Sequence, residues 1–389
     1  MNKTSLQNLY IQFQLIRIMV EKINPYEVEG KIDYNKLIKE FGVKKLTPEI
    51  LKEIEKITGE LHPYLKRGIF FAYRDLKEVL DEYKKGNKFF LYTGRAPSGP
   101  IHLGHITVWL FMKWLQEKFG VDVWFQFPDE EKFLFKQDAK WDEIQKWTYE
   151  NMLDVVALGF DPKRTHFLID TKHAGIMYPE AIKVAKKITF SSIKAAFGFN
   201  DSNNIGSIFY TSMQTVPIFL PNILNKENKP CLIPLGIDQD VHFRLSRDVV
   251  EKLGHKKPAI IHAKFMPPLT GIEGKMSSSN PDNAILMTDS PNEVKRKINK
   301  YAFSGGKDTA KEHRKYGGNV EVDIACQWLK YFEEDDKKLE KIYDDYKKGK
   351  LLSGEIKKIL IDKINEFLAG HQKRRKEAPK LLDKFIYKI

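Results

Sequence analysis

The sequence predicts an α/β fold, in which a doubly wound parallel sheet is followed by an all-helical C-terminal domain. Between residues 89 and 289, short apolar runs alternate with longer segments of helical spacing, as in a parallel sheet with crossover helices. Loops rich in Gly, Pro or Ser follow two of these runs, and such sheets bind ligands at the carboxyl ends of their strands. After residue 289 the strand patterns stop and helical patterns continue.

The first strand, loop and helix of the sheet are expected between residues 89 and 119. Phe89–Tyr92 is a short aromatic run that suits a buried strand, and residues 94–100 then interrupt regular structure with Gly and Pro. Trp109–Leu115 has the spacing of a largely buried helix. Further strands are predicted at Val121–Phe127, Thr165–Ile169, Pro230–Gly236, Pro258–Phe265 and Ala284–Met287, and helices over Asp142–Leu158, Tyr178–Phe199 and from Asp240 to about Leu253.

Two further regions flank the sheet. Residues 23–88 carry no nucleotide motif and are mostly helical in pattern, as in Thr47–Leu61, so an appended N-terminal region is predicted. Ser290–Glu293 has the arrangement of a capping box with Pro at the first helical position, which marks the start of the C-terminal domain. The predicted domains are therefore residues 1–88, 89–289 and 290–389.

Charge and cysteine content narrow the classes of partner and compartment. The net charge of +13 with a pI of about 9.3 points to a polyanionic partner. Two Cys in 389 residues imply no disulfide framework and fit a reducing compartment. Polar residues interrupt the apolar ones in Met1–Lys22, so no signal segment is predicted. The expectation is a cytoplasmic protein with no membrane partner, and an organellar leader is the alternative.

The loop after the first strand leads into His102-Leu-Gly-His105. Two imidazoles one turn apart at a helix start can bond a phosphate, because free N–H groups and the positive end of the helix dipole lie there. Gly104 leaves room for a flat ring against the backbone. The alternatives are two ordinary polar residues or part of a metal site. The metal reading is weak, because Cys231 and Cys326 show no paired spacing, and no metal ligand is predicted.

A second loop, Gly274–Ser279, follows another predicted strand and reads GKMSSS. A Lys and hydroxyl groups on a Gly-led loop can close over a triphosphate, since the ammonium neutralises charge and the hydroxyls bond oxygens. In isolation, a solvated Ser-rich turn is the alternative. Together, the HLGH and KMSSS segments resemble the paired ATP-binding motifs of class I aminoacyl-tRNA synthetases.

The resemblance extends over most of the chain. From about Asn24 to the end, the sequence is similar to tryptophanyl-tRNA synthetases of the archaeal and eukaryotic cytosolic type. This resemblance implies a Rossmann-like catalytic domain with a dimer-interface insertion at about 141–221, an anticodon-binding helical domain and a homodimer. Besides the two motifs, the segments that carry it are Leu91–Gly94, Phe125–Lys136, Ala196–Asp201, Cys231–Asp240, Tyr301–Gly306 and HQKRRKE from His371.

The resemblance also implies an activity and a set of ATP contacts. The family activates L-tryptophan with ATP and transfers it to tRNA(Trp), releasing pyrophosphate and AMP; ATP enters as its Mg²⁺ complex, and no structural metal is implied. The implied catalytic residues are His102, His105 and Lys275. Arg95 and Lys132 are either phosphate contacts or structural ion-pair partners. The full implied ATP set is Thr93, Gly94, Arg95, His102, Gly104, His105, Lys132, Lys275, Met276, Ser277 and Ser279.

A tryptophan pocket follows once the sheet is granted. Tyr92 ends the first strand and Gln126 lies in the second, and a phenol or amide oxygen accepts the one N–H of an indole. Glu131 offers charge for the substrate ammonium, and Gln214 and Gln239 offer amides for its polar ends. For Tyr92 alone, a core aromatic is the alternative. These five residues match the substrate-binding positions of the family.

Two positions depart from the pattern of the family. Ser278 stands where many class I enzymes have a second Lys, so Mg²⁺, Lys275 or Lys132 must then stabilise the leaving pyrophosphate. Lys307 and Asp308 occupy the positions of anticodon-reading residues, and Lys lacks the planar fork of the Arg that is common there. They are predicted to contact tRNA, with an ion pair near a helix start as the alternative. The basic segment His371–Ile389 is either a solvated helix face or an RNA contact.

Three rival functions remain open from the sequence. Tyrosyl-tRNA synthetases share both ATP motifs but need a partner for the phenol hydroxyl. A non-catalytic RNA-binding protein with this fold is disfavoured by intact His102, His105 and Lys275. Small-substrate nucleotidyltransferases with the same HxGH motif lack the basic helical C-terminal domain.

Overall fold

The computed structural model describes residues 32–276 and 281–389; the segment Met1–Lys22 and the predicted contacts Ser277 and Ser279 lie outside the described residues. A seven-stranded sheet has the order β1-β2-β7-β6-β3-β4-β5. The five strands from β7 to β5 run parallel, while β2 pairs antiparallel with β7 and β1 with β2. The strands are β1 Lys44–Lys45, β2 Phe70–Arg74, β3 Phe90–Gly94, β4 Asp122–Phe127, β5 Thr165–Ile169, β6 Cys231–Gly236 and β7 Ala259–Ala263.

Helices cover both faces of this sheet, which confirms the doubly wound arrangement. Successive side chains of β3 point to opposite faces: Leu91 joins a core with α6 and α8, whereas Phe90 and Tyr92 join a core with α9, α11 and α13. The helices of this part are α6 Leu103–Phe119, α7 Glu131–Phe135, α8 Trp141–Ala157, α9 Ala174–Ala185, α10 Phe190–Phe197, α11 Ile205–Met213, α12 Leu220–Asn225 and α13 Asp240–Lys252, with short 3₁₀ turns at Val216–Ile218, Ile237–Gln239 and Pro281–Asn283.

The structure corrects two element predictions and adds a strand to a third region. Residues 23–88 are predicted to be mostly helical, and within them Phe70–Arg74 also forms a nearly fully buried strand, since its apolar run fills the space beside β7. The predicted strand Ala284–Met287 is wrong: its ladder reduces to one bridge between Leu286 and His102, because only the start of α6 lies beside it. The single helix predicted over Tyr178–Phe199 is split into α9 and α10, and Thr189 caps the second by accepting from Ser192 N–H.

The N-terminal region is tied to both neighbours. Its helices are α2 Tyr34–Phe41, α3 Pro48–Thr58, α4 Pro63–Lys66 and α5 Leu76–Lys84. Arg67, after α4, donates to Asp336 Oδ1 over 2.8 Å and to the carbonyl of Glu333 over 2.6 Å, so it reaches the C-terminal helices. One hydrophobic core runs from Leu46 through the sheet to Phe385. The core is therefore continuous across both predicted domain boundaries.

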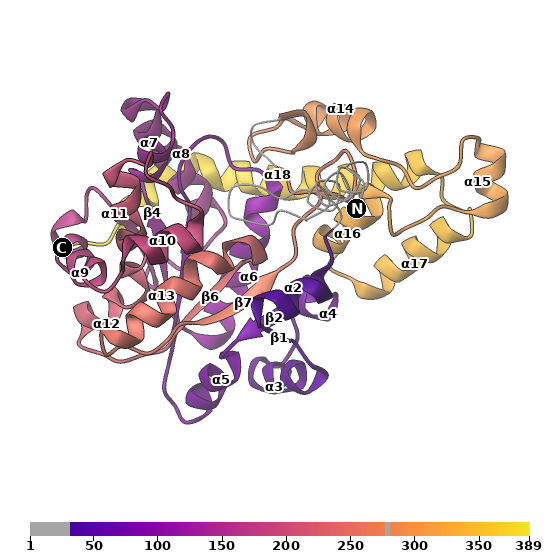
Figure 1. The fold of residues 1–389 in the computed structure, drawn as a ribbon. Coiled ribbons are helices and arrows are strands. Elements are labelled where there is room, and N and C mark those ends of the chain that lie inside the picture. The colour runs from indigo at the N-terminus through magenta and orange to yellow at the C-terminus, as the bar shows by residue number, and fades with distance from the viewer. Residues whose placement is uncertain (1–31, 277–280) are drawn as a thin grey trace, which may run out of the picture.

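The C-terminal part is helical, as predicted: α14 Pro291–Tyr301, α15 Ala310–Tyr316, α16 Ile324–Phe332, α17 Asp336–Lys347 and α18 Ser353–Leu381, with a 3₁₀ turn at Leu382–Lys384. Ser290 caps α14 by accepting from Glu293 N–H over 3.2 Å. In Figure 1, α15 and α17 lie at the opposite end of the molecule from α9 and α12, and α18 runs between the two ends, packed on α8. None of the described helices has the length and apolar composition that crossing a membrane requires.

Part of the basic segment at the end of the chain has structural partners. Arg375 Nε donates to Asp154 Oδ1 over 2.6 Å, and the buried His371 contacts the same carboxylate at 3.1 Å. These contacts fasten α18 to α8. Beyond α18, Phe167 N–H donates to the carbonyl of Phe385, and Tyr387 N–H donates to that of Phe167, so residues 385–387 pair with β5 at the edge of the sheet.

Candidate active site

A cavity of about 370 Å³ opens at the carboxyl ends of β3, β4, β6 and β7. This is the edge at which a doubly wound sheet binds its ligands. Lys307 and Asp308 do not line it; they are exposed in the loop of residues 302–309 between α14 and α15. Fourteen of the residues predicted from sequence line the cavity: Tyr92, Thr93, Gly94, Arg95, His102, Gly104, His105, Gln126, Glu131, Lys132, Gln214, Gln239, Lys275 and Met276.

The two imidazoles stack at the start of α6. His102 has extended backbone angles and caps the helix, while His105 lies in its first turn. Their ring centroids are 3.7 Å apart, and the ring of Trp109 lies nearly parallel beyond His105. The backbone N–H of His102 donates to His105 Nδ1 over 3.3 Å, so the ring proton of His105 resides on Nε2. His105 thereby offers an N–H donor from a fixed ring.

Both imidazoles are neutral at physiological pH. Burial lowers the pKa of His102 to about 3, with a further contribution from the positive charge of Arg95. Burial, then the neighbouring His102 and Arg95, hold the pKa of His105 well below its ordinary value. These side chains can therefore donate hydrogen bonds to phosphate oxygens without adding charge.

The helix start has fewer free N–H groups than the sequence suggested. Leu103 N–H donates to the carbonyl of Ile285 over 3.0 Å, because the segment after the second loop lies against α6. Gly104 faces a narrow space: a Cβ there would lie 3.1 Å from the His102 ring and 3.4 Å from Met276 Cβ. A side chain at position 104 would therefore intrude between the two predicted ATP motifs.

Lys275 reaches the cavity from the second loop. Its Nζ lies 2.9 Å from Asp238 Oδ2, and Gln239 Nε2 donates to the same oxygen over 3.1 Å. The carboxylate thus holds the ammonium and one predicted substrate amide together. Asp238 was not among the predicted site residues, although it lies within the IDQD segment that carried the resemblance.

Arg95 and Lys132 differ in the partners that their charged groups have. Lys132 Nζ forms an ion pair with Glu131 Oε1 at 2.6 Å, which is the structural alternative left open by the sequence. Arg95 Nε and Nη2 are buried and have no hydrogen-bond partner among the described residues. Burial lowers the pKa of Arg95 to about 10, so the guanidinium is still charged at neutral pH. A partly buried guanidinium with two unpaired nitrogens on the cavity wall favours an anionic ligand.

Polar side chains of β3 and β4 meet at the other end of the cavity. Tyr92 donates its hydroxyl to Gln126 Oε1 over 2.5 Å, and both residues are buried. Tyr210 on α11 donates to Glu131 Oε2 over 3.0 Å. Burial works to raise the pKa of Glu131, but the charge and hydrogen bond of Lys132 outweigh it, so the pKa lies below its ordinary value. Glu131 is therefore an ionised carboxylate that can bind an ammonium group.

Sequence reasoning missed three side chains around this end. Tyr210 lines the cavity on α11, Asp170 accepts a hydrogen bond from Gln126, and Glu130 adjoins Glu131. Asp170 directly follows β5 at the carboxyl edge of the sheet, and Gln126 lies near the end of β4 at the same edge. The same strand-end argument therefore applied to it, whereas Tyr210 stands in a helix without a motif.

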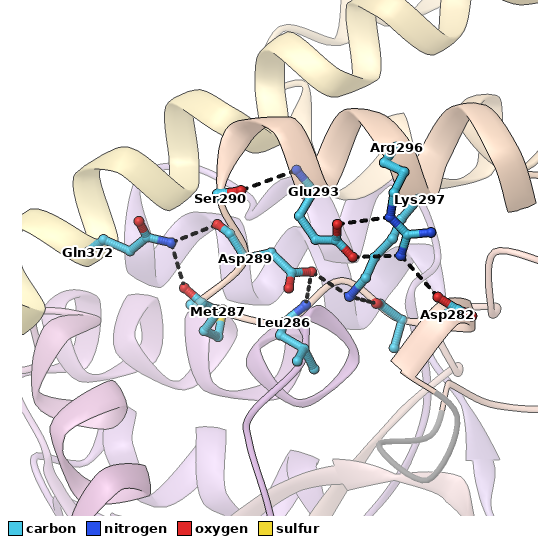
Figure 2. Close-up of polar contacts among 10 residues, drawn as sticks. Asp282, Leu286, Met287, Asp289, Ser290, Glu293, Arg296, Lys297 and Gln372 are labelled. Carbon is cyan, nitrogen blue, oxygen red and sulfur yellow. Dashed lines mark hydrogen bonds and ion pairs between the residues drawn. The ribbon is translucent and has the colours of Figure 1, made fainter.

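The segment after the second loop is held from two sides (Figure 2). Lys297 on α14 donates to Asp289 Oδ2 over 2.8 Å and to the carbonyl of Ala284 over 3.1 Å. Gln372 on α18 donates to the carbonyls of Met287 and Asp289, each over 3.0 Å. Because this segment also pairs with residues 101–103, the C-terminal helices support the start of α6. Across the described ranges, no group of three or more His, Cys, Asp or Glu is placed to hold a metal ion.

Comparison with known proteins agrees with this geometry. The family model for tRNA synthetases class I (W and Y) matches residues 84–369. The tryptophan–tRNA ligase of Saccharolobus solfataricus is 50% identical over 366 residues, which cover 94% of this chain and 95% of that one. The one of Thermococcus onnurineus is 51% identical over 368 residues, 94% of each chain.

Solved structures agree as well. The crystal structure of Plasmodium falciparum tryptophanyl-tRNA synthetase has a TM-score of 0.87 and 45% identity, covering 92% of this chain and 98% of that chain. The tryptophanyl-tRNA synthetase of Aeropyrum pernix has a TM-score of 0.83 at 29% identity. The resemblance inferred from the two motifs is confirmed: the chain belongs to the class I tRNA synthetase family that acts on tryptophan and tyrosine (W and Y).

Proposed function

We propose that this chain activates L-tryptophan with ATP and charges tRNA(Trp). The observation that carries the proposal is one cavity that holds both ATP motifs at one end and the bonded pair Tyr92–Gln126 at the other. The relatives named above as tryptophan–tRNA ligases match over nearly the full chain, which favours tryptophan over tyrosine.

In the first step, a carboxylate oxygen of tryptophan forms a bond to the α-phosphorus of ATP. The bond from that phosphorus to the bridging oxygen breaks, and pyrophosphate leaves. No covalent enzyme intermediate is needed, so positioning and electrostatic stabilisation supply the catalysis. His102 and His105 donate neutral hydrogen bonds, while Lys275 and Arg95 bring positive charge to the phosphates. Thr93, Gly94 and Met276 complete the wall around the nucleotide.

The amino acid lies at the other end of the cavity. Tyr92 accepts the indole N–H, Glu131 binds the ammonium, and Gln214 and Gln239 bond the remaining polar atoms. Phenylalanine is rejected, because it leaves a buried acceptor without a donor. ATP enters as its Mg²⁺ complex, in which the metal neutralises the leaving pyrophosphate. Two Cys residues that are buried and form no disulfide support a cytoplasmic location.

In the second step, a terminal ribose hydroxyl of tRNA attacks the carbonyl carbon of the adenylate, and AMP leaves. Lys307 and Asp308 contact the anticodon from the exposed loop of residues 302–309. Their position, outside the cavity lining, supports a role in tRNA binding and not in activation.

Amino-acid-dependent ATP–pyrophosphate exchange tests the proposal, with each standard amino acid offered separately. Exchange with tryptophan alone is the expected result. Exchange with tyrosine would keep the family and overturn the pocket assignment. No exchange with any amino acid would favour a non-catalytic RNA-binding function.

We further propose a homodimer whose interface includes the predicted insertion at about 141–221. On α9, Tyr178 and Ile182 stand one turn apart and are 52% and 48% exposed, which suits a buried contact between subunits. Ile182→Glu is expected to shift the protein to monomer in sedimentation velocity. Tyr316→Glu is the matched control, since Tyr316 is also exposed but lies on α15, and it is expected to leave the dimer intact. A monomeric wild type would contradict the dimer.

A further inference from the structure

Behind the indole end of the cavity, three side chains form a chain of hydrogen bonds. Tyr92 donates to Gln126 Oε1 over 2.5 Å, and Gln126 Nε2 donates to Asp170 Oδ2 over 2.7 Å. Tyr92 is 2% exposed, Gln126 1% and Asp170 0%, so water cannot substitute for a missing partner. Asp170 lies behind Gln126 and is absent from the cavity lining, so it acts on the ligand only through its neighbours.

Asp170 determines the direction of this chain. Asp170 Oδ2 accepts the hydrogen bond from Gln126 whether the carboxyl group is ionised or carries a proton on Oδ1, so the amide nitrogen of Gln126 faces Asp170 and the amide oxygen faces Tyr92. In that direction the Tyr92 hydroxyl is committed as a donor to Gln126, and its lone pairs are left for a donor in the cavity. An amide nitrogen and oxygen have nearly the same shape, so without Asp170 the amide could turn and reverse every bond.

A second carboxyl group supports Asp170. Glu130, in the turn after β4, shares a side-chain hydrogen bond with Asp170. Apart from this contact, Asp170 Oδ1 and Glu130 Oε2 are buried and have no partner among the described residues. Two ionised carboxylates cannot bond each other, so the contact requires one proton between them. Asp129 is not available for this role, because its oxygens accept from Thr171 and Gln145.

The surroundings keep that proton in place near neutral pH. Burial, with the charge of Asp129 adding to it, raises the pKa of Glu130 to about 7. Burial and the neighbouring Glu130 raise the pKa of Asp170 well above its ordinary value. Asp170 and Glu130 are therefore expected to titrate as one unit.

The other titratable groups around the pair come from four elements. Glu131 on α7 is ionised, with its pKa below the ordinary value. Tyr92 on β3 and Tyr210 on α11 are both buried, and burial raises the pKa of each well above 10. On α13, burial lowers the pKa of His242 to about 4. Between about pH 6 and pH 8 these groups keep their charge states, so a change in that range reports the pair.

We propose that Asp170, through a proton shared with Glu130, is a positioning residue that holds the Tyr92 oxygen as an acceptor and so makes the pocket selective for an aromatic ring with an N–H donor. The inference rests on the proposed activation of tryptophan. It adds to that function two residues that do not touch the substrate but determine which substrate is accepted.

Asp170→Asn tests the direction of the chain. Asparagine has nearly the same shape but offers both a donor and an acceptor, so Gln126 is no longer held in one orientation. The readout is the ratio of kcat/KM in pyrophosphate exchange for tryptophan to that for 3-benzothienylalanine, in which sulfur replaces the indole N–H. The ratio is expected to fall roughly tenfold, because the lost discrimination is that of one buried hydrogen bond.

Asp323→Asn is the matched control, because Asp323 is equally buried and accepts three hydrogen bonds in the C-terminal part. General damage to the fold lowers kcat/KM for both substrates alike and leaves their ratio unchanged. An unchanged ratio in Asp170→Asn, with tryptophan activation intact in the wild type, would overturn the inference but not the proposed function. If the wild-type protein shows no pyrophosphate exchange with any amino acid, the inference and the proposed function fail together.

Glu130→Gln tests the shared proton and does not depend on how Asp170 variants fold. Its amide stays uncharged at every pH, as the protonated acid is below pH 7. In wild type the KM for tryptophan is expected to rise several-fold as pH passes upward through about 7, since Glu130 then ionises and places a buried charge beside Asp170. In Glu130→Gln the KM is expected to stay flat over the same range. Equal pH dependence in both proteins would overturn the proposal.

Thermal unfolding gives a second readout with a defined sign. Because folding raises the pKa of Glu130, its contribution to stability is full at low pH and is lost as pH rises from its ordinary value of 4.5 through about 7. The Tm of wild type relative to Glu130→Gln is therefore expected to fall between pH 5 and pH 8. A difference that is constant with pH would contradict the shared proton.

Discussion

At the scale of single residues, the end of the cavity proposed to bind the nucleotide separates hydrogen-bond donors from charges. His102 and His105 are stacked, buried and neutral, so they can donate hydrogen bonds without the free-energy cost of burying a positive charge. Arg95 carries charge on a guanidinium with two unpaired nitrogens, and Lys275 carries it on a loop beside Asp238. Removing a donor is consequently expected to slow adenylate formation, whereas removing a cation is expected to weaken ATP binding.

His105→Ala is expected to lower the rate of adenylate formation by about 100-fold or more, because it removes one preorganised donor to the reacting phosphate. Tryptophan binding, measured by calorimetry, should change much less, since Tyr92 and Gln126 lie at the other end of the cavity. Single-turnover adenylate formation provides the rate. Normal activation kinetics in this variant would remove His105 from the mechanism.

Arg95→Met is expected to raise the KM for ATP by about tenfold or more, because a charge-assisted hydrogen bond to phosphate is lost. The same change should stabilise the protein without ATP by roughly 1 kcal/mol, since methionine does not leave a cation unpaired in a buried site. Pyrophosphate exchange gives the first quantity and urea unfolding the second. A variant that is both weaker in ATP binding and less stable would show that Arg95 has a structural partner.

Much of the cavity wall could be predicted from sequence at this scale, because its residues stand in motifs with specific spacing. His102, Gly104, His105 and Lys275 are of this kind, and the structure brings them to one cavity. Asp170 follows a predicted strand without any motif, and its importance depends on contact with Gln126, 44 residues earlier. Contacts of that kind are set by the register of β4 against β5, which a sequence pattern does not specify.

At the scale of elements, the start of α6 is held by a segment that is neither helix nor strand. Residues 284–289 pair with residues 101–103 on one side and bond to α14 and α18 on the other (Figure 2). Sequence patterns predicted a strand here from four apolar residues. They could not show that the neighbouring backbone is a helix start, which offers partners for a few residues only.

Lys297→Met is expected to destabilise the protein by about 3–5 kcal/mol, because Asp289 is left as a buried charge without its ammonium partner. Both side chains are almost fully buried, at 3% and 8% exposure, so solvent cannot compensate. Urea unfolding measures the loss. The double variant Lys297→Met/Asp289→Asn should recover most of it, whereas additive losses would show that the ion pair contributes little.

At the scale of the whole molecule, the cavity and the proposed tRNA contacts lie at separate places. The cavity belongs to the sheet, while Lys307 and Asp308 stand in an exposed loop before α15, the helix that lies far from α9 in Figure 1. The two are joined by α18 and by a continuous core. The fold class and the order of its parts followed from the sequence, but the continuity of the core did not, because it depends on packing between distant helices.

Lys307→Ala is expected to lower the kcat/KM for aminoacylation of tRNA(Trp) by about tenfold, because one charged contact to RNA is lost. Pyrophosphate exchange with tryptophan should stay near the wild-type value. Lys315→Ala, on α15, serves as a comparison for general loss of positive charge. Loss of both steps in Lys307→Ala would indicate misfolding and not a defect in tRNA binding.

The pairing of residues 385–387 with β5 also has a consequence for synthesis. Phe167 and Ile386 stand 219 residues apart in the chain (386 − 167). At about 5–20 residues per second, a ribosome needs roughly 10–45 s to make that interval. Until then the outer edge of β5 presents unpaired N–H and C=O groups, which can pair with strands of other nascent chains. The speed of translation, and not only the stability of the finished fold, therefore governs how long this edge stays open.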